Sequence, residues 1–210
     1  MEGALRGGAD DPGLRLIETA LWDGAGCPRI AGHLARLAAG AAALGWPCDP
    51  GRARAALRGP EGAPARLRLT LDREGRIEVA AAPLPPPIPV WRLGLAAARL
   101  RSDDPWLRVK STRRAAYDAA RAALGPDLDE AVLLNERDEV CDGSIATVFF
   151  DCGAGLRTPP LSAGLLPGVL RAELIAAGRC REETLRAEDL PRVRLWIGNS
   201  VRGLCPARWA

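Results

Sequence analysis

One lysine, Lys110, stands among 29 basic residues, and all the others are arginines. The chain also lacks glutamine and is crowded with Ala, Arg, Gly and Pro, a bias that replaces lysine wherever arginine can serve. Arginine cannot serve as a nucleophilic amine, because a guanidinium stays protonated whereas a lysine amine can lose its proton and form a Schiff base. Lys110 is therefore a candidate nucleophile. The alternative is a surface lysine that persists by chance.

A second candidate is the segment at 164–171, GLLPGVLR, which has the features of an anion site. Two glycines and Pro167 lead into a predicted helix start, where backbone N–H groups and the helix dipole favour a phosphate. The segment matches neither the P-loop nor the dinucleotide fingerprint, and a plain loop-to-helix turn is the alternative. The pair Asn199-Ser200 either adds a hydroxyl and N–H donors to the same anion or forms an ordinary turn.

Three other polar residues are open to two interpretations each. Asp142, in VCDGSIATVFF, is either a carboxylate that pairs with a buried cationic ring nitrogen or the first residue of an Asp-Gly turn. Arg36 is a phosphate clamp or a solvated flank of its helix. His33, one turn earlier, is favoured as a hydrogen-bonded structural residue over a catalyst. A Schiff-base amine, an anion site and an isolated carboxylate together describe pyridoxal phosphate.

The composition excludes several other classes of protein. With 210 residues, 48% hydrophobic and 26% charged, the chain is predicted to form one large or two small globular domains. The net charge, 29 − 26 = +3, is too small to imply a nucleic-acid or membrane partner. No apolar run is long enough for a membrane span, and we expect no secretory signal. Six scattered cysteines without a CxxC pair predict no metal site and a cytoplasmic location.

The elements that must position these residues mix strands and helices in both halves. We expect residues 1–13 to be loose, a strand at 14–21, a helix at 29–45 that stops at Gly45, and a short helix at 52–58. A hairpin of strands at 65–71 and 76–82 follows. Residues 83–90 contain five prolines and are predicted to connect two subdomains, although a proline-rich ligand for another protein is the alternative.

In the second half, Ser111 is predicted to cap a helix at 112–124, which puts Lys110 at a strand–helix junction. Strands are predicted at 130–134, 146–150 and 195–198. A helix at 169–177 is predicted to end at Gly178.

The sequence resembles the class IV pyridoxal-phosphate aminotransferase family from about Leu16 to Ala207. The pieces that carry the resemblance, in order, are IET (17–19), HLARL (33–37), VKSTRRAAY (109–117), DEAVLLNERDEVCDGSIATVFF (129–150), TPPLSAGLLPGVLR (158–171) and GNSVRGLCPA (198–207). The order and spacing of these pieces, taken together, are specific to the family, whereas each piece alone is weak evidence. The resemblance implies the α/β (α+β) fold of that family. It comprises a small N-terminal α+β subdomain at 1–90, shortened at its start, and a β-barrel-like cofactor-binding subdomain with helices at 91–210.

The resemblance also implies cofactor roles for individual residues. Lys110 matches the family's Schiff-base lysine and proton shuttle, Asp142 the carboxylate that pairs with the pyridine nitrogen, and Arg36 the arginine that holds the phosphate. The remaining phosphate contacts, two from backbone N–H groups and one from a hydroxyl, match Val169, Leu170 and Ser200.

Within the family, the resemblance is closest to the lyases that eliminate pyruvate from 4-amino-4-deoxychorismate to give 4-aminobenzoate for folate. Thr19 falls where these lyases have a hydroxyl near the reacting substrate and amino-acid aminotransferases tend to have glycine. Arg202 is a candidate for a substrate carboxylate from its position only. The alternatives are transamination of branched-chain or D-amino acids, and a non-catalytic relative. A homodimer that acts on a small molecule is implied, as is typical of the family.

Three departures from the family pattern stand out. Asp142 replaces the usual glutamate, which shortens the arm by ~1.5 Å, and Thr147 replaces the usual asparagine. Family members carry additional strands and a Tyr-Gly-Asp-Gly-type approach before the motif that this chain reaches at Ile17. We therefore expect that part of the substrate-site wall is absent or that translation starts upstream.

Overall fold

The computed structural model describes residues 2–210, which form two compact units. The first unit comprises the chain up to Pro86 together with Arg108–Arg113, and the second comprises Pro87–Leu107 and Arg114–Ala210. The first change of unit falls within the proline-rich segment. Two domains that meet at residue 90 stay a prediction, because compact units of one chain need not fold independently.

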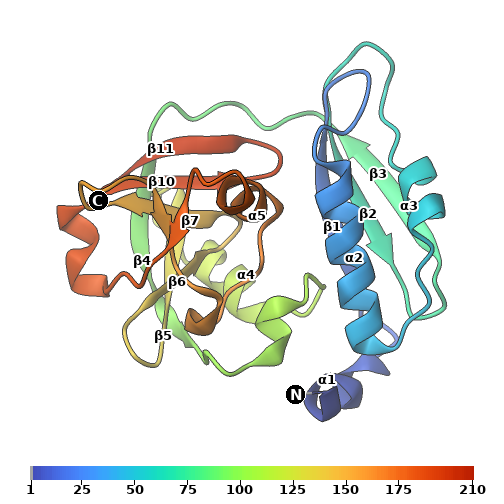
Figure 1. The fold of residues 1–210 in the computed structure, drawn as a ribbon, viewed down its shortest axis with the longest axis horizontal. Coiled ribbons are helices and arrows are strands. Elements are labelled where there is room, and N and C mark those ends of the chain that lie inside the picture. Colours follow the sequence, from blue (N-terminus) through green and yellow to red (C-terminus); the bar gives the residue numbers. More distant parts are fainter. Residues whose placement is uncertain (1) are drawn as a thin grey trace. The chain divides into compact units, whose positions relative to one another are not determined.

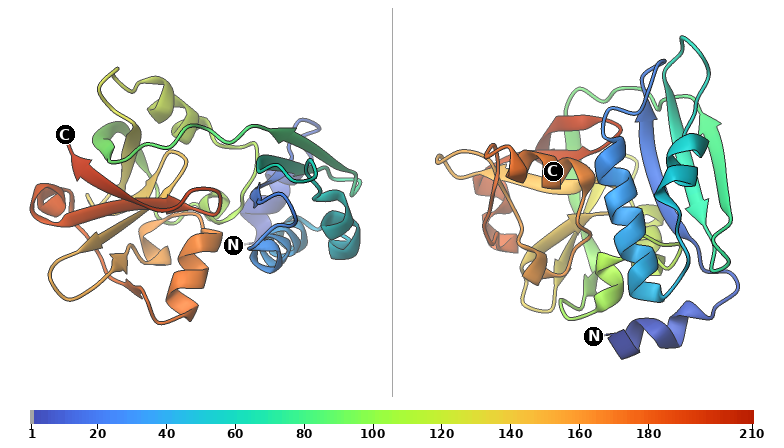
Figure 2. Two further views of the ribbon diagram at one scale, coloured as in Figure 1. Left: turned by 90° about the horizontal axis from the view of Figure 1, so that it is seen from above. Right: turned by 45° about the vertical axis from the view of Figure 1, so that its right-hand side comes forward.

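The first unit is built on a small antiparallel sheet of β1 (Leu16–Trp22), β2 (Ala65–Leu71) and β3 (Ile77–Ala82), in that order. Helices α2 (Ile30–Leu44) and α3 (Pro50–Ala56) lie on one face of this sheet (Figures 1 and 2). Alternate residues of β2 are buried and exposed, as expected for a sheet with one covered face. The predicted strand, helix and hairpin of this region are confirmed.

The ends of the two helices follow from local sequence. Gly45 ends α2 in the left-handed conformation, with φ at 72°, as predicted. Asp49 begins α3, because its carboxylate accepts hydrogen bonds from the backbone N–H groups of Gly51 and Arg52. This cap, together with Pro50, starts the helix two residues earlier than the sequence analysis predicted.

Two expectations about this unit were wrong. Residues 1–13 were expected to be loose, but α1 (Glu2–Ala9) forms there, with Leu5 and Ala9 buried one helical turn apart. Ser111 was expected to cap a helix from Thr112, but Ser111 pairs with Leu16 of β1 in an antiparallel bridge. The helix that follows, α4 (Ala115–Ala122), starts after Arg114 instead. Ser111 therefore pairs with a strand that is distant in the sequence instead of capping a helix.

The second unit is a curled eight-stranded sheet with helices against it (Figure 1). Its strands stand in the order β6-β5-β4-β11-β10-β7-β8-β9. Their bounds are β4 (Trp91–Leu100), β5 (Glu130–Asn135), β6 (Val140–Gly143), β7 (Thr147–Asp151), β8 (Arg157–Thr158), β9 (Arg181–Glu182), β10 (Arg194–Asn199) and β11 (Gly203–Trp209). Helix α5 (Val169–Ala176) and the 3₁₀ turns η1 (Pro105–Arg108), η2 (Leu161–Ala163) and η3 (Ala187–Arg192) complete the chain.

Side chains from alternate strand positions divide the second unit into separate cores. One face of the sheet packs around Trp91, Val148, Phe150 and Ile197, all nearly inaccessible to solvent. On the other face, one cluster joins β5 to α4 and η2 through residues such as Leu133, Ala120 and Ala163. A further cluster on that face packs α5 on β7 through Leu170, Leu174 and Phe149. We refer to this second side as the helix face of the curled sheet.

The fold is thus of the mixed α+β class, with a curled sheet and a smaller sheet, as expected. Among the helices of the described part of the chain, none has both the length and the apolar character of a membrane span.

Candidate active site

In the first unit, the backbone of Lys110 extends the small sheet along β1. Ile17 donates its N–H to the carbonyl of Lys110 at 2.9 Å, so these two residues lie opposite each other. Leu16 and Val109 both approach Gly40 of α2, which places their side chains on the helix-covered face. Because side chains alternate along a strand, Lys110 and Ile17 point to the opposite face. We call it the open face of the small sheet, because the arginines of β2 on this face are exposed, although Ile17 itself is buried.

Thr19 lies two residues after Ile17 on β1 and therefore shares the open face with Lys110. The register of β1 and β2 places Arg68 directly opposite Thr19, and Arg66 opposite Leu21. Both arginines are exposed. The open face thus combines an amine, a hydroxyl and two guanidinium groups, a set suited to an anionic substrate.

Arg36 lies on α2 and reaches β1 from the helix-covered face. Its Nε donates to Glu18 Oε1 at 2.8 Å and its Nη2 donates to Glu18 Oε2 at 2.6 Å. His33 Nδ1 lies 2.6 Å from the same Oε2. Glu18 and His33 are each 1% exposed. The strand that pairs with Lys110 therefore also holds Arg36, through a carboxylate that the sequence analysis gave no role.

The charge of this buried group is set by its partners. Burial favours the neutral carboxyl, but the charge and hydrogen bond of Arg36, with those of His33, hold the pKa of Glu18 below its usual 4.5. Glu18 is consequently ionised at neutral pH, and the pair with Arg36 is a charge-assisted, two-pronged one.

In the second unit, Asp142 lies on β6 opposite Leu133, which belongs to the helix face of the curled sheet. The residue is 5% exposed. Gly143 N–H donates to its Oδ1 at 3.2 Å and Leu166 N–H to its Oδ2 at 3.4 Å. The carboxylate is therefore held in place by backbone groups from its own strand and from the segment that leads into α5.

Helix α5 begins at Val169, inside the segment 164–171 that was predicted to form an anion site. Gly168 is its N-cap residue and carries no side chain to cap the first N–H groups, which belong to Val169 and Leu170. A Cβ at Gly168 would lie 2.8 Å from Thr147 Oγ1. The start of α5 therefore packs closely on β7, and a side chain there would push it away.

The same helix start packs on β10. A Cβ at Gly198 would lie 2.7 Å from Leu170 Cδ2 and 2.9 Å from the Gly203 carbonyl oxygen, so a larger residue beneath the first turn of α5 would force its neighbours to shift. Ser200 follows two residues later. The Oδ1 of Asn199 accepts hydrogen bonds from the N–H groups of Val201 and Arg202, at 3.0 Å each, and so shapes this turn. The structure thus places Leu170 against Gly198, two residues before Ser200.

Arg202, the candidate for a substrate carboxylate, stacks on an aromatic ring. Its guanidinium carbon lies 5.0 Å from the ring centroid of Trp91 in a cation–π contact. This contact fixes part of the side chain within the second unit, and its substrate role stays a prediction.

A second buried carboxylate shapes the loop between Asp142 and β7. Glu130 is fully buried and its Oε1 accepts hydrogen bonds from the N–H groups of Ala131, at 3.0 Å, and Ser144, at 2.9 Å, while the Ser144 hydroxyl also donates to it. Ile145 N–H donates to Oε2 at 3.2 Å. Burial raises the pKa of Glu130, although these bonds oppose the shift. The sequence analysis assigned this residue only to a strand.

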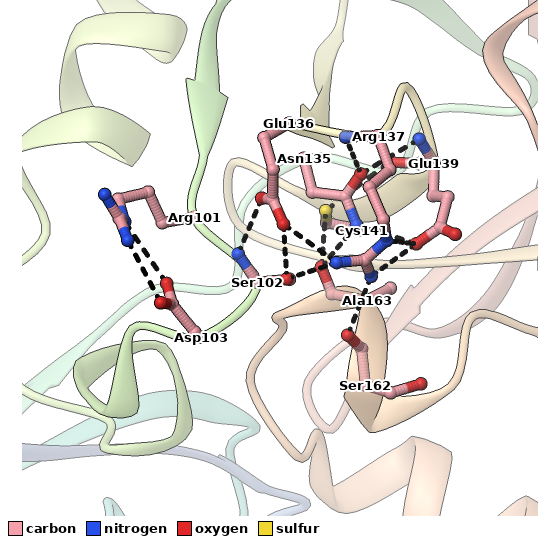
Figure 3. Close-up of polar contacts among 10 residues, drawn as sticks. All are labelled: Arg101, Ser102, Asp103, Asn135, Glu136, Arg137, Glu139, Cys141, Ser162 and Ala163. Carbon is pink, nitrogen blue, oxygen red and sulfur yellow. Dashed lines mark hydrogen bonds and ion pairs between the residues drawn. The ribbon is translucent and has the colours of Figure 1, made fainter. Parts of the chain in front are cut away.

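The segment before α5 is anchored by the polar network of Figure 3. Arg137 donates to Ser102 Oγ at 2.5 Å, Glu136 at 2.8 Å and the Ser162 carbonyl at 3.1 Å. Asn135 Nδ2 donates to the Ala163 carbonyl at 3.0 Å. This network fixes η2, and the chain then continues to the Leu166 N–H that contacts Asp142.

The predicted site residues therefore fall into two groups. The first unit holds Thr19 and Lys110 on the open face of the small sheet, and Arg36 on α2, which covers the other face. The second unit holds Asp142, Val169, Leu170, Ser200 and Arg202. Sequence reasoning missed three residues near these groups: Glu18 bonds Arg36, Glu130 holds the loop after Asp142, and Arg68 lies opposite Thr19 in the strand pairing. Only Glu18 had a local signal, because it stands inside the IET motif.

The residues present match the functional groups of pyridoxal phosphate. Lys110 is an amine for its aldehyde, Asp142 is a buried carboxylate for its ring nitrogen, and the start of α5 offers N–H groups to its phosphate. The space around Gly168 and Gly198 is too small for a Cβ, which shows that the start of α5 packs closely on the sheet. No group of three or more His, Cys, Asp or Glu side chains is placed to hold a metal ion within the described residues.

Comparison with known proteins agrees with the fold. A mixed α+β fold with a curled sheet and a smaller sheet is the fold of class IV aminotransferases. The family model described as amino-transferase class IV matches residues 15–209. The chain belongs to this family, whose members are pyridoxal-phosphate-dependent enzymes.

Individual relatives carry different activities in their names. The "Putative aminodeoxychorismate lyase" of Schizosaccharomyces pombe is 28% identical, over 90% of this chain and 87% of its own. The structure of a "Putative amino-acid aminotransferase" from Mesorhizobium loti is 45% identical, with a TM-score of 0.87, over 94% of this chain and all of its own.

Two other structures show the fold alone, because their identities are low. The 4-amino-4-deoxychorismate lyase of Pseudomonas aeruginosa is 22% identical, with a TM-score of 0.78, over 93% of this chain and 82% of its own. A hypothetical aminotransferase from Mycobacterium tuberculosis, with α-ketoglutarate and PMP bound, is 23% identical, with a TM-score of 0.82, over 96% of this chain and 83% of its own.

Proposed function

We propose that the protein is a pyridoxal-phosphate-dependent lyase that converts 4-amino-4-deoxychorismate to 4-aminobenzoate and pyruvate. The observation that carries the proposal is the register of β1, which puts the Thr19 hydroxyl and the Lys110 amine on the same face of the small sheet. The relative from S. pombe supports it through its name. The structure of the M. tuberculosis aminotransferase with PMP supports the choice of cofactor.

Each predicted cofactor residue has a defined task in this proposal. Lys110 Nζ would bond the cofactor aldehyde, Asp142 would pair with the ring nitrogen and Arg36 would bind the phosphate. The N–H groups of Val169 and Leu170 and the Ser200 hydroxyl would donate to that phosphate. When bound, pyridoxal phosphate supplies an aldehyde that condenses with amines and a ring that withdraws electrons from the neighbouring carbon.

The reaction requires a base and a proton donor from the chain. Lys110 Nζ, when it is not bonded to the cofactor, would take the proton from the substrate's ring C–H as general base. The bond between the ring carbon and the ether oxygen would break as the ring becomes aromatic. The released enolpyruvate would take up a proton, delivered with the help of Thr19 Oγ1, to give pyruvate. Lys110 would then take the place of the product amine, so that the cofactor would end as it began.

The open face of the small sheet explains how such a substrate would be held. 4-Amino-4-deoxychorismate carries two carboxylates, and Arg68 and Arg66 are exposed on the face that bears Thr19. Arginine recognises a carboxylate through two parallel hydrogen bonds. We propose that Arg68 binds one of the two carboxylates, because it lies directly opposite Thr19 in the strand pairing.

The test is a pyruvate assay on the purified protein with added pyridoxal phosphate. Wild-type protein is expected to release pyruvate from 4-amino-4-deoxychorismate and to show a visible imine band that borohydride fixes on Lys110. The variant Lys110→Ala is expected to lose both. Pyruvate release by this variant above the enzyme-free background contradicts the proposal.

Transamination of a branched-chain or D-amino acid is the second candidate, and the 45% identity to the M. loti protein favours it. The two candidates differ in what remains after one turnover. A transaminase leaves the cofactor in its amine form until a keto acid arrives, whereas a lyase regenerates the aldehyde. Absorption spectra before and after addition of one substrate distinguish them. A protein that binds no cofactor at all would be a non-catalytic relative.

We further propose that the enzyme acts as a homodimer in the cytoplasm. All six cysteines are free thiols, which suits a reducing compartment. Light scattering of the purified protein measures the assembly, and a monomer at micromolar concentration contradicts it.

A further inference from the structure

A buried carboxylate fixes the arginine that the proposed function assigns to phosphate. Glu18 is 1% exposed and uses both oxygens on Arg36, at 2.8 Å from Nε and 2.6 Å from Nη2. Burial of a charged carboxylate is costly unless its oxygens are well bonded, and a bidentate arginine meets that need. The same two bonds fix the plane of the guanidinium and direct its Nη1 end away from Glu18.

We propose that Glu18 is a positioning residue that, with His33, holds the Arg36 guanidinium in the orientation that binds a phosphate group. The inference rests on the proposed function, in which Arg36 binds the phosphate of the cofactor. An arginine side chain has many rotamers, and a phosphate that binds a mobile one must order it. An arginine that is already fixed by Glu18 loses less freedom, so the phosphate binds more tightly.

The environment of His33 supports this assignment. Its Nδ1 faces Glu18 Oε2 at 2.6 Å, so the proton is assigned to Nδ1. Within the described part of the chain, its buried Nε2 meets no hydrogen-bond partner. An unsatisfied buried nitrogen costs stability that an apolar residue would avoid. The contact that His33 gains in exchange is the one to Glu18, which prevents the carboxylate from rotating away from Arg36.

The test compares two ligands that differ only in phosphate. Glu18→Gln keeps the size of the side chain but removes the charge and one acceptor. It is expected to weaken pyridoxal phosphate binding by about 10- to 100-fold, as expected for loss of a charge-assisted contact, and to change pyridoxal binding by less than about twofold. Inorganic phosphate, titrated as a competitor, is expected to lose affinity in parallel. Absorption of the visible band and competition titration provide these constants.

The control is Glu74→Gln, the same chemical change in an ion pair of the same unit. Glu74 pairs with Arg73 on an exposed turn, at 2.6 Å, and both side chains are nearly half exposed. This variant is expected to bind both ligands like wild type. Glu18→Asp keeps the charge but withdraws the carboxylate by ~1.5 Å. Its affinity for pyridoxal phosphate is expected to lie between those of wild type and Glu18→Gln.

Each outcome decides the inference. An equal loss of affinity for both ligands, or no loss of affinity for either, overturns it. Failure of both Glu18 variants to fold also overturns it, because the carboxylate would then serve only the stability of the core. Selective loss of phosphate-bearing ligands supports it. Failure of wild-type protein to bind pyridoxal phosphate is a different result, since that refutes the proposed function itself.

Discussion

Substitution of Gly198 by alanine tests how closely the start of α5 is packed on the sheet. The added Cβ would lie 2.7 Å from Leu170 Cδ2 and 2.9 Å from the carbonyl oxygen of Gly203. Leucine can change its rotamer, but the Gly203 carbonyl belongs to β11, which pairs with β10 at this point. The methyl group must therefore displace backbone, or the first turn of α5 must lift.

The size of the effect follows from the crowding of a well-packed core. Overpacking by one methyl group costs about 1–3 kcal/mol when backbone must move. In a chain of 210 residues this lowers Tm by about 2–12 °C. Because Leu170 is also a proposed phosphate contact, the affinity for pyridoxal phosphate is expected to fall by about tenfold or more.

Thermal unfolding by circular dichroism, without and with pyridoxal phosphate, measures both effects. Gly125→Ala is the matched control, because a Cβ there meets no atom within 4 Å among the described residues. The free energy of unfolding of that variant is expected to lie within about 0.5 kcal/mol of the wild-type value. If Gly198→Ala has the Tm and the cofactor affinity of Gly125→Ala, the packing argument for the phosphate site is refuted.

Three further predictions concern charge. Arg68→Ala is expected to lower kcat/KM for 4-amino-4-deoxychorismate by about 10- to 100-fold, mainly through KM. The control Arg54→Ala, on the exposed surface of α3, is expected to change kcat/KM little. Steady-state kinetics measure both variants, and equal kcat/KM values for the two contradict the assignment of Arg68 to the substrate. Asp142→Asn is expected to bind pyridoxal phosphate but to lower kcat at least about tenfold, and full turnover contradicts the ring-nitrogen pair. Because the pKa of Glu18 is lowered in the folded protein, its stabilising contribution is complete above pH 4.5 and is lost as the pH falls through the folded value. The free energy of unfolding, measured with urea, is expected to fall less between pH 7 and pH 3.5 in Glu18→Gln than in wild type. An equal fall in the two proteins contradicts the contribution assigned to Glu18.

Elements with a clear period could be predicted from the sequence, and elements that depend on tertiary pairing could not. The helix that ends at Gly45 and the hairpin at 65–82 were predicted because apolar spacing and turn residues agree there. Strand β4 was missed because its alanines and arginines carry little β-propensity. Strand β11 was missed because it contains Pro206, which is unusual within a sheet.

The candidate site shows the same division. Lys110 could be singled out because it is the only lysine of the chain, and Asp142 because it lies between two strand-like segments. Glu18 could not be connected with Arg36 from the sequence, because 18 residues separate them and their contact depends on how α2 packs on β1. Arg68 could not be connected with Thr19, since only the register of β1 and β2 makes them neighbours. Alternation within a strand was visible from the sequence, but the pairing of the strands was not.

The path of the chain through its two units has a consequence for synthesis and for truncation. The segment Arg108–Arg113 belongs to the first unit, although Pro87–Leu107 before it belongs to the second. During translation, the first unit therefore stays incomplete along β1 until residue 113 has left the ribosome. A fragment that ends at Pro86 would expose the unpaired N–H and C=O groups of β1, a template for association with other chains. The lysine thus lies in the last segment that the first unit receives, and neither unit can be cut from the other by a single break in the chain.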